Sequence, residues 1–356
     1  MLAEAVTLFS TKRRFQMFSS KAFWALTTIA IAAVLLYRST VEWTDPKRPS
    51  PESIAFITGG EGPYWQAAID GATAAADERG IRLVVHQPKN SEDVAEQMQI
   101  LSVVSSSDVG AVAISPVEPE RQAPLITQIG VTKPIVTFDS DAAKSGRHGY
   151  IGTSNFSAGL VAGTLVKSAI PEGGEIAVLM ANKTKENLIE RQGGIRTRIA
   201  ESPNPEESPT DRRYKILGFF TDEGDDAACE KQIRDLVDGH PDLACVVTLN
   251  SRQGPVVMRT LEDLGATERV KLIAFDTSDA ILDGIEAGTV YAAVAQDPYK
   301  YGYEAISMLD SLCRGDERQL PMVGRGAVHF SVEPLRQGDV EAFRKRTESR
   351  HPVSKG

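Results

Sequence analysis

Short apolar runs alternate with amphipathic stretches from Ile54 onward, and this alternation limits the possible folds more than any other feature of the sequence. Strands and helices that alternate at this spacing predict parallel sheets with right-handed crossovers. There are too many strands for one lobe, so we expect an α/β protein of two doubly wound parallel-sheet lobes that face each other. The expected strands are Ile54–Ile57, Leu83–His86, Ala111–Ile114, Ile135–Phe138 and Gly149–Ile151 in the first series and Glu175–Met180, Tyr214–Phe219, Cys245–Leu249, Lys271–Phe275 and Val290–Ala295 in the second.

A glycine-rich turn follows the first expected strand. Its glycines allow the backbone to turn tightly, and Pro63 suits the first turn of a helix, where its missing N–H costs nothing. We expect that helix over Tyr64–Arg79 and a later helix that begins with Ser91 as its cap. Tyr64 and Trp65 would then lie outside the carboxyl end of the first strand, where open parallel sheets bind their ligands.

Later strands end in the same way, with one polar residue at the carboxyl tip. Asp139 follows a strand of the first series, Asn250, Asp276 and Gln296 follow strands of the second, and Arg191 lies on a helix between them. Asp and Asn at such positions can simply cap helices, and a lone Arg is usually a surface charge. A buried amide is harder to explain, because it demands partners. Their recurrence at successive tips favours a binding cleft.

The chemistry of this set suits a ligand that carries many hydroxyl groups. Aromatic rings stack on the apolar face of a sugar, and carboxylates, amides and arginine form paired hydrogen bonds with hydroxyls. No residue of the set is a nucleophile with a base beside it. A glycosidase could use Asp139 and Asp276, but only with one raised pKa and a defined separation. We therefore predict a binding protein that is not an enzyme and needs no cofactor.

Composition and motifs count against several other classes of protein. The formal net charge of −9 argues against a nucleic-acid partner. A dinucleotide-binding turn would need a glycine at Trp65, and the sequence has no phosphate loop. The five histidines show no metal-ligand spacing. The three cysteines, Cys229, Cys245 and Cys313, are best read as small buried residues, although the sequence leaves one disulfide open.

The amino-terminal segment has the pattern of an export or anchoring sequence. Four basic residues precede an apolar run, Ala22–Tyr37, which predicts a cytoplasmic start and an exported remainder. No small-residue cleavage site follows cleanly, so we expect an uncleaved anchor in the inner membrane, with a cleaved signal peptide as the alternative. The proline-containing segment Asp45–Pro51 separates this run from the folded part. The basic residues are Lys12, Arg13, Arg14 and Lys21.

From Ile54 to about Val332 the chain resembles periplasmic sugar-binding proteins of the ribose-binding type, which share their fold with the effector domains of LacI-type repressors. The matching segments are Ile54–Gly71, Pro134–Asp139, Tyr150–Gly159, Glu190–Gly194, Val246–Asn250, Leu272–Asp276 and Ala293–Pro298. The resemblance implies a type I periplasmic binding protein, whose two lobes hinge at three crossings near Ser154, Asp297 and Gly324. It implies sugar-binding roles for Tyr64, Trp65, Asp139, Arg191, Asn250, Asp276 and Gln296.

The same resemblance sets the expected domains and partners. Residues 1–50 would form the amino-terminal segment, 51–154 plus 297–325 one lobe, and 155–296 plus 326–356 the other. The implied function is capture of a monosaccharide in the cleft, in the periplasm or at the cell surface, and delivery by a monomer to an ABC transporter permease. A sensor kinase is the alternative partner. A LacI-type repressor would need a basic helix-turn-helix where this chain has an apolar run.

Two departures from the ribose-binding pattern affect the expected ligand. Ribose binders typically have Asn-Pro-Phe-Phe in the first turn, whereas this chain has Gly62-Pro63-Tyr64-Trp65. They also carry an arginine after the aspartate of the fourth strand, where this chain has Ser140. Loss of one amide and one guanidinium changes which hydroxyls are paired. The resemblance therefore favours a pentose, hexose or related polyol over ribose itself.

Overall fold

The computed structural model describes residues 20–42, 48–202, 210–316 and 326–348. The chain divides into two units, Met1–Lys47 and Arg48–Gly356. Helix α1 (Ser20–Glu42) belongs to the first unit. In the described part of the chain, no helix is both long enough and apolar enough to cross a bilayer. The basic residues at positions 12 to 14 lie outside the described residues.

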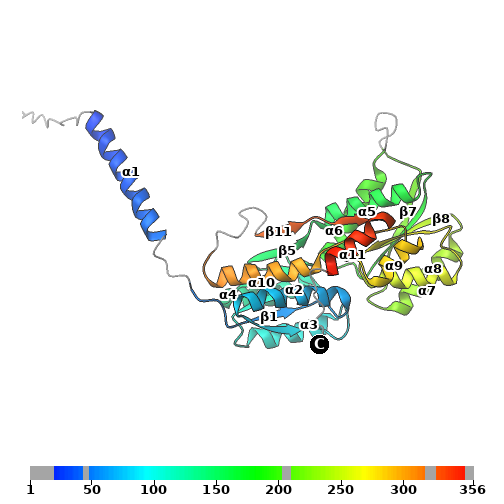
Figure 1. The fold of residues 1–356 in the computed structure, drawn as a ribbon, viewed down its shortest axis with the longest axis horizontal. Helices are drawn as coiled ribbons and strands as arrows, with labels where there is room; N and C mark the ends of the chain where they lie inside the picture. Colours follow the sequence, from blue (N-terminus) through cyan, green and yellow to red (C-terminus); the bar gives the residue numbers. More distant parts are fainter. Residues whose placement is uncertain (1–19, 43–47, 203–209, 317–325, 349–356) are drawn as a thin grey trace, which may run out of the picture. The chain divides into compact units, whose positions relative to one another are not determined.

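The first lobe of the second unit contains a six-stranded parallel sheet with the order β11-β5-β4-β3-β1-β2. Figure 1 labels β1, β5 and β11 of this sheet. Helices α2 and α10 cover one face of this sheet, and α3 and α4 cover the other. The strands are β1 (Ser53–Ile57), β2 (Arg82–His86), β3 (Ala111–Ile114), β4 (Ile135–Phe138), β5 (Gly149–Thr153) and β11 (Ala327–Phe330). The helices are α2 (Pro63–Arg79), α3 (Val94–Ser105), α4 (Pro119–Thr132) and α10 (Pro298–Cys313).

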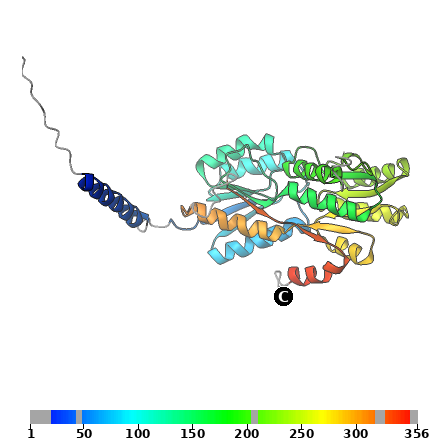
Figure 2. The ribbon, with the colours of Figure 1, turned by 90° about the horizontal axis from the view of Figure 1, so that it is seen from above.

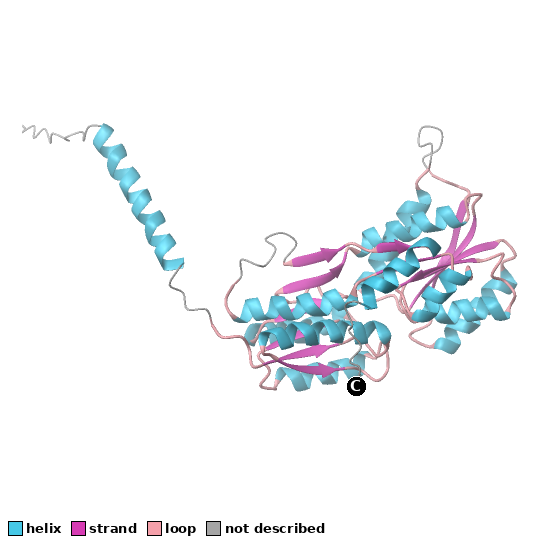
Figure 3. Ribbon diagram, in the orientation of Figure 1, coloured by secondary structure: helices cyan, strands magenta, loops and turns pink. Residues whose placement is uncertain are grey.

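The second lobe repeats this arrangement with the strand order β12-β10-β9-β8-β6-β7, and here only β12 is antiparallel to its neighbour among the described strands. The strands are β6 (Gly174–Met180), β7 (Tyr214–Thr221), β8 (Leu243–Thr248), β9 (Lys271–Phe275), β10 (Ala292–Ala295) and β12 (Glu333–Leu335). The helices are α5 (Asn155–Ala169), α6 (Glu186–Ala200), α7 (Asp226–Gly239), α8 (Gln253–Asp263), α9 (Asp279–Ala287) and α11 (Val340–Glu348), with the 3-10 turn η2 (Gln337–Asp339) before α11. In each lobe the strands lie between layers of helices (Figure 3). The predicted fold class is therefore confirmed.

The central strands are apolar throughout because both faces of each sheet are covered. Ile54 and Phe56 of β1 belong to the core under α2 and α10, whereas Ala55 and Ile57 belong to the core under α3 and α4. All four side chains are fully buried. Successive side chains of a strand point to opposite faces, so a run with no polar position is what two covered faces require.

Helix α3 begins later than the sequence suggested. Its cap is Asp93, whose carboxylate accepts a hydrogen bond of 3.0 Å from the backbone N–H of Glu96. Ser91, which we expected in that role, lies against Gly60 of the loop between β1 and α2. Both are good capping residues, so composition alone could not decide between two candidates that stand two positions apart.

Three connections cross between the lobes within the described residues (Figure 2). Ser154 joins β5 to α5, Gln296 and Asp297 join β10 to α10, and the segment 331–332 joins β11 to β12. The first two agree with the expected crossings. The third corrects the expected boundary at residue 326, because β11 pairs with β5 in the first sheet, from Ala327–Tyr150 to Phe330–Thr153. Gly324 itself lies outside the described residues.

Close packing of α5 against α6 fixes the position of the helix that carries Arg191. A Cβ added at Gly159 would collide with the carbonyl oxygen of Arg191, and one added at Gly194 would collide with the carbonyl oxygen of Phe156. The two glycines thus let the two backbones touch. The contact therefore requires glycine at positions 159 and 194 and holds the α6 backbone at Arg191 against α5.

Candidate functional site

All seven side chains proposed from the sequence line one cavity of about 90 Å³ between the two lobes. The first lobe provides Tyr64, Trp65 and Asp139, and the second provides Arg191, Asn250, Asp276 and Gln296. Six of them lie shortly after the carboxyl end of a strand and Arg191 lies on α6, so the parallel sheets and the helices that follow their strands bring them together although they are far apart in sequence. Their convergence on one cavity is a feature of the structure.

Asp139 is the polar centre of the first-lobe half of the cavity. Its carboxylate accepts hydrogen bonds from the Tyr64 hydroxyl at 2.6 Å and from the Ser115 hydroxyl at 3.0 Å. Its backbone has a φ of 60°, and its N–H donates to the carbonyl of Ile151 on β5. A non-glycine residue adopts this left-handed conformation at a cost that the surrounding contacts must offset. The conformation holds the carboxylate at the tip of β4.

The two aromatic residues form an apolar wall beside Asp139. The rings of Tyr64 and Trp65 meet edge to face, with centroids 5.1 Å apart, and Trp65 makes a similar contact with Phe138 at 6.3 Å. Trp65 is 9% exposed, so most of its surface packs in the core. Burial, followed by the charge of Asp139, raises the pKa of Tyr64 well above its usual value, so its hydroxyl stays protonated and donates.

Arg191 organises the second-lobe half. Its guanidinium donates to Asn155 Oδ1 at 3.0 Å, to the carbonyl of Leu249 at 2.7 Å and to Gln296 Oε1 at 2.7 Å. It also lies over the ring of Phe275, 4.6 Å from the centroid. The residue is 2% exposed. Through these bonds the buried guanidinium joins α6 to α5 and to the residues that follow β8 and β10. It also faces the cavity.

Asp276 is the second-lobe counterpart of Asp139. Its φ is 65°, and its N–H donates to the carbonyl of Val294 on the neighbouring strand β10. Its carboxylate accepts a hydrogen bond of 2.8 Å from the amide of Gln296. Burial raises the pKa of Asp276 to about 6, while the charge of Arg191 and the bond from Gln296 oppose the rise and the charge of Asp139 adds to it.

Asn250 combines a turn-forming role with its place in the cavity. Its side-chain oxygen accepts hydrogen bonds from the backbone N–H groups of Arg252 at 3.1 Å and Gln253 at 3.0 Å. The simpler explanation, that Asn250 supports the start of a helix, therefore holds for its oxygen. Within the described residues its NH₂ group makes no hydrogen bond, which leaves two donors at the cavity wall.

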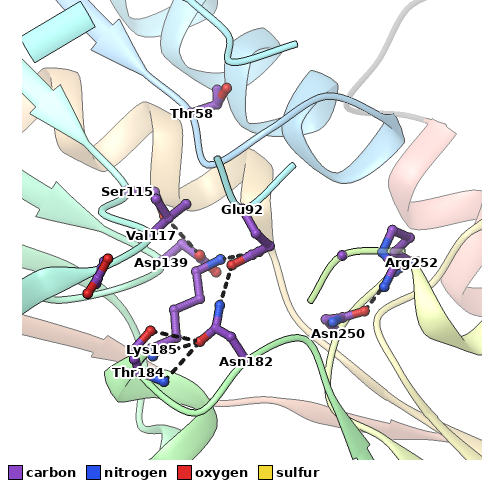
Figure 4. A network of polar contacts seen from close by, with 12 residues as sticks. Thr58, Glu92, Ser115, Val117, Asp139, Asn182, Thr184, Lys185, Asn250 and Arg252 are labelled. Atoms are coloured by element: carbon purple, nitrogen blue, oxygen red, sulfur yellow. Dashed lines mark hydrogen bonds and ion pairs between the residues drawn. The ribbon is translucent and has the colours of Figure 1, made fainter. Parts of the chain in front are cut away.

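An ion pair between the two lobes lines the cavity, and Figure 4 shows its two side chains, Glu92 and Lys185. Glu92, in the loop before α3, accepts from Lys185 Nζ at 2.7 Å and from Asn182 Nδ2 at 2.6 Å. Asn182 and Lys185 belong to the loop before α6 in the other lobe. The sequence analysis missed all three residues. Glu92 and Lys185 each lie in a loop with no strand-tip signal, and only the meeting of the lobes brings them together.

Asn187 is a further cavity residue that the sequence analysis did not select. It lies on the first turn of α6, is 5% exposed and lines the cavity. Its Oδ1 has no hydrogen-bond partner among the described residues. Its position one helical turn before Arg191 was the available signal, because residues four apart share a helix face.

A larger hollow of about 570 Å³ adjoins the cavity. It shares Tyr64, Asp276 and Gln296 with the cavity but does not reach Asp139 or Arg191. Residues of α9, α11 and the crossings form much of its lining. We take the smaller cavity as the candidate site, because the convergent donors and acceptors lie there.

The structure offers little for metal or thiol chemistry in the residues it describes. No group of His, Cys, Asp and Glu side chains there could hold a metal ion. Cys229, Cys245 and Cys313 are free, so the open question of a disulfide is answered in this structure. Burial raises the pKa of Cys229 to about 12, which keeps that thiol unreactive.

Comparison with known proteins identifies the family. The profile of the periplasmic binding protein domain matches residues 54–317. The ribose import binding protein of Salmonella typhimurium is 21% identical over 258 residues, which are 72% of this chain and 83% of that protein. These matches confirm the predicted resemblance to ribose-type binding proteins. They also agree with the prediction that the chain is not an enzyme.

Solved structures agree with this result. The ABC transporter solute-binding protein of Burkholderia graminis, solved in complex with D-arabinose, is 26% identical with a TM-score of 0.73 and covers 83% of this chain and 98% of its own. The XylFII–LytSN complex contains a chain that is 24% identical, with a TM-score of 0.71, over 82% of this chain and 100% of that chain. From residue 54 to 317, then, this chain belongs to the periplasmic binding protein domain family.

Proposed function

We propose that this protein captures a monosaccharide between its two lobes and delivers it to an ABC transporter in the membrane. One observation carries the proposal: aromatic, carboxylate, amide and guanidinium groups from both lobes converge on one cavity. Aromatic rings can stack on the apolar face of a sugar, and the polar groups match hydroxyls as donors and acceptors. The relatives named for ribose import and the solved complex with D-arabinose support the same class of ligand.

The size of the cavity favours a single sugar ring over an oligosaccharide. Its volume of about 90 Å³ is below the ~300–1,000 Å³ typical of sites for drug-sized ligands. Several of its polar groups are bonded to each other, as Tyr64 is to Asp139 and Gln296 to Asp276. Ligand hydroxyls would replace these bonds one for one, so little hydrogen-bond energy would be lost when the lobes enclose the ligand.

Capture would follow from rotation of the lobes about the three crossings. A ligand that contacts both lobes binds better to the closed arrangement and so shifts the population toward it. A membrane partner would then recognise the closed protein. In the described residues, Glu92 of one lobe and Lys185 of the other form an ion pair that lines the cavity, and closure of the lobes would keep this contact.

A sensor kinase remains the second candidate partner. The structural neighbour XylFII is found in a complex with LytSN, so a protein of this fold can be bound by another chain. Sugar-dependent crosslinking in cells would separate the two candidates. Capture of a permease supports the transport proposal, and capture of a sensor kinase without a permease contradicts it.

We further propose that the protein is exported to the periplasm and stays tethered by its amino-terminal segment. The support is the apolar run with basic residues before it and the exposure of large apolar side chains on α1, including Leu26, Ile29 and Leu36. The protein should therefore sediment with membranes. A mature amino terminus after Tyr37 would overturn the tether.

The central test is a thermal-shift screen of the full-length protein against D-ribose, D-arabinose, D-allose, D-tagatose, D-glucose and D-galactose, with calorimetric titration of any hit. A sugar at a thousandfold excess over its Kd should stabilise the protein by about 4 kcal/mol. Asp139→Ala should abolish binding. The matched control is Asp310→Ala, which removes a buried carboxylate of the same lobe that does not line the cavity and should leave affinity within threefold of wild type. No stabilising sugar, or normal binding by Asp139→Ala, would contradict the proposal.

A further inference from the structure

The Glu92–Lys185 ion pair lies in the wall of the candidate cavity and joins the two lobes. The Lys185 side chain is 7% exposed and that of Glu92 is 15% exposed, so water screens the pair little. Both residues line the cavity together with the proposed ligand-binding set. The pair therefore sets part of the charge that a ligand would meet.

The contacts of this pair are built into the two loops that carry it. Asn182 Oδ1 accepts from the backbone N–H groups of Thr184 and Lys185, at 3.1 Å and 2.9 Å, while its amide donates to Glu92 (Figure 4). Glu92 has a φ of 66°, a conformation that a non-glycine residue keeps only where its surroundings hold it. The geometry is thus imposed from both lobes.

The charges along the cavity wall do not favour an anionic ligand. Among the described residues that line it, the cations are Lys185, Arg191 and Arg252, and the carboxylates are Glu61, Glu92, Asp139 and Asp276. Each cation already has protein partners. Lys185 pairs with Glu92, Arg191 donates to Gln296 and the carbonyl of Leu249, and Arg252 bonds Asp222 at 2.6 Å.

We propose that Glu92 is a specificity-determining residue that restricts the cavity to uncharged sugars by keeping the Lys185 ammonium paired. This inference rests on the proposed function, since it concerns which sugars the site accepts. An acidic sugar would bring a further carboxylate to this wall. Among the described lining residues the carboxylates already outnumber the cations, and each cation already has a protein partner. Removing the charge of Glu92 would leave Lys185 able to pair with the carboxylate of an acidic sugar whose ring has the same size as that of the neutral sugar.

The test compares neutral sugars with their acids by calorimetric titration of the full-length protein. The matched pairs are D-ribose and D-alluronate, D-arabinose and L-galacturonate, D-glucose and D-glucuronate, and D-galactose and D-galacturonate, because each acid has the pyranose ring of its neutral partner with a carboxylate on C5. Wild type should bind the acid of its preferred pair at least 100-fold more weakly than the neutral sugar. Glu92→Gln should raise the acid-to-neutral affinity ratio at least tenfold, and the double variant Glu92→Gln/Lys185→Met should return it to the wild-type value.

The double variant separates specificity from closure. If Glu92 only holds the lobes together, Glu92→Gln weakens neutral and acidic ligands equally and the ratio stays unchanged, which overturns the inference. An equal rise in the ratio in the single and double variants, or acid binding by wild type as tight as that of the neutral sugar, also overturns it.

If Glu92→Gln does not fold, Lys185→Met supplies the reciprocal test, because an unpaired Glu92 should lower the acid-to-neutral ratio at least threefold, and an unchanged ratio refutes the inference. If wild type binds none of the eight compounds, the proposed function fails and this inference falls with it, whereas binding of a neutral sugar with no change of selectivity in the variants refutes the inference alone.

Discussion

The two lobes place an aspartate at the same point of the same structural unit but surround it differently. Asp139 and Asp276 both follow a central strand, adopt a left-handed backbone and donate their N–H to the neighbouring strand. Two hydroxyls bond Asp139, whereas one amide bonds Asp276 near a buried guanidinium. The shared fold thus fixes the backbone position, and the neighbouring side chains decide the chemistry.

This difference gives the cavity a polarity. The first lobe presents an aromatic wall and an acceptor, whereas the second presents donors from Arg191 and Asn250 beside the carboxylate of Asp276. A sugar has an apolar face and hydroxyls that both donate and accept, so only some orientations satisfy both halves at once. Two lobes with the same fold can therefore hold a ligand that lacks twofold symmetry in one orientation.

The largest effect is expected for Arg191→Met in the second lobe. It would leave three buried acceptors without their donor and Asp276 without a nearby cation, and should lower the free energy of unfolding by about 3–5 kcal/mol. Sugar affinity should fall more than 100-fold. Denaturant unfolding and calorimetric titration measure the two effects.

The control for Arg191 comes from the first lobe. Arg147 is also buried, with 4% of its side chain exposed, and bonds Asp141 at 2.6 Å without lining the cavity. Arg147→Met should therefore destabilise the protein but change sugar affinity less than threefold. Equal loss of affinity in the two variants would show that destabilisation, and not the cavity, explains the effect.

The aspartates themselves should respond with opposite signs to replacement by asparagine. Asparagine accepts the left-handed backbone as well as aspartate does, so the comparison isolates the side chain. Asp139→Asn replaces one acceptor of a hydroxyl hydrogen bond and should cost about 1–2 kcal/mol of unfolding free energy at pH 7.5.

In contrast, Asp276→Asn keeps an acceptor for Gln296 and removes a buried charge, so it should stabilise the protein by about 1–2 kcal/mol at pH 7.5. Denaturant unfolding of both variants measures this difference. A loss of stability in Asp276→Asn comparable to that in Asp139→Asn would show that the two lobes treat their carboxylates alike.

The smallest effect is a pH dependence that belongs to the second lobe. The folded-state pKa of Asp276, about 6, lies above the ordinary value of 3.8, so folding favours its protonated form. Its contribution to stability is fully present below pH 3.8 and is lost as the pH rises through 6. Between pH 7.5 and pH 5, wild type should gain about 1 kcal/mol relative to Asp276→Asn.

Sugar binding should change in the opposite direction, because a hydroxyl donates a stronger hydrogen bond to the ionised carboxylate of Asp276 than to its protonated form. Affinity should therefore weaken as the pH falls through about 6 and lose this dependence in Asp276→Asn. A midpoint that stays near 6 in that variant would assign the titration to another group.

Much of the candidate site could be predicted because it depends on strand ends. The apolar runs mark the strands, parallel pairing brings their carboxyl ends to one edge, and Asp139, Asn250, Asp276 and Gln296 follow directly in sequence. The place of Asn187 in the cavity could not be predicted without knowing which face of α6 points inward. Ser91 and Asp93 could not be separated as caps, because both have the right chemistry.

The division of the chain between lobes was less predictable near its end. Strand β11 is short and only partly buried, so its sequence carries no sign of which sheet it joins. Its pairing with β5 assigns residues 327–330 to the first lobe and moves the third crossing to residues 331–332.

The alternation of strands and helices, the two-lobe architecture and the polar strand tips could all be predicted from the order of residues, because they follow from local periodicity and from the direction of parallel strands. The pairing of Glu92 with Lys185 and the raised pKa of Asp276 became apparent from the folded chain alone. Burial and long-range charge pairing depend on how distant segments meet, and no local pattern of residues records that meeting.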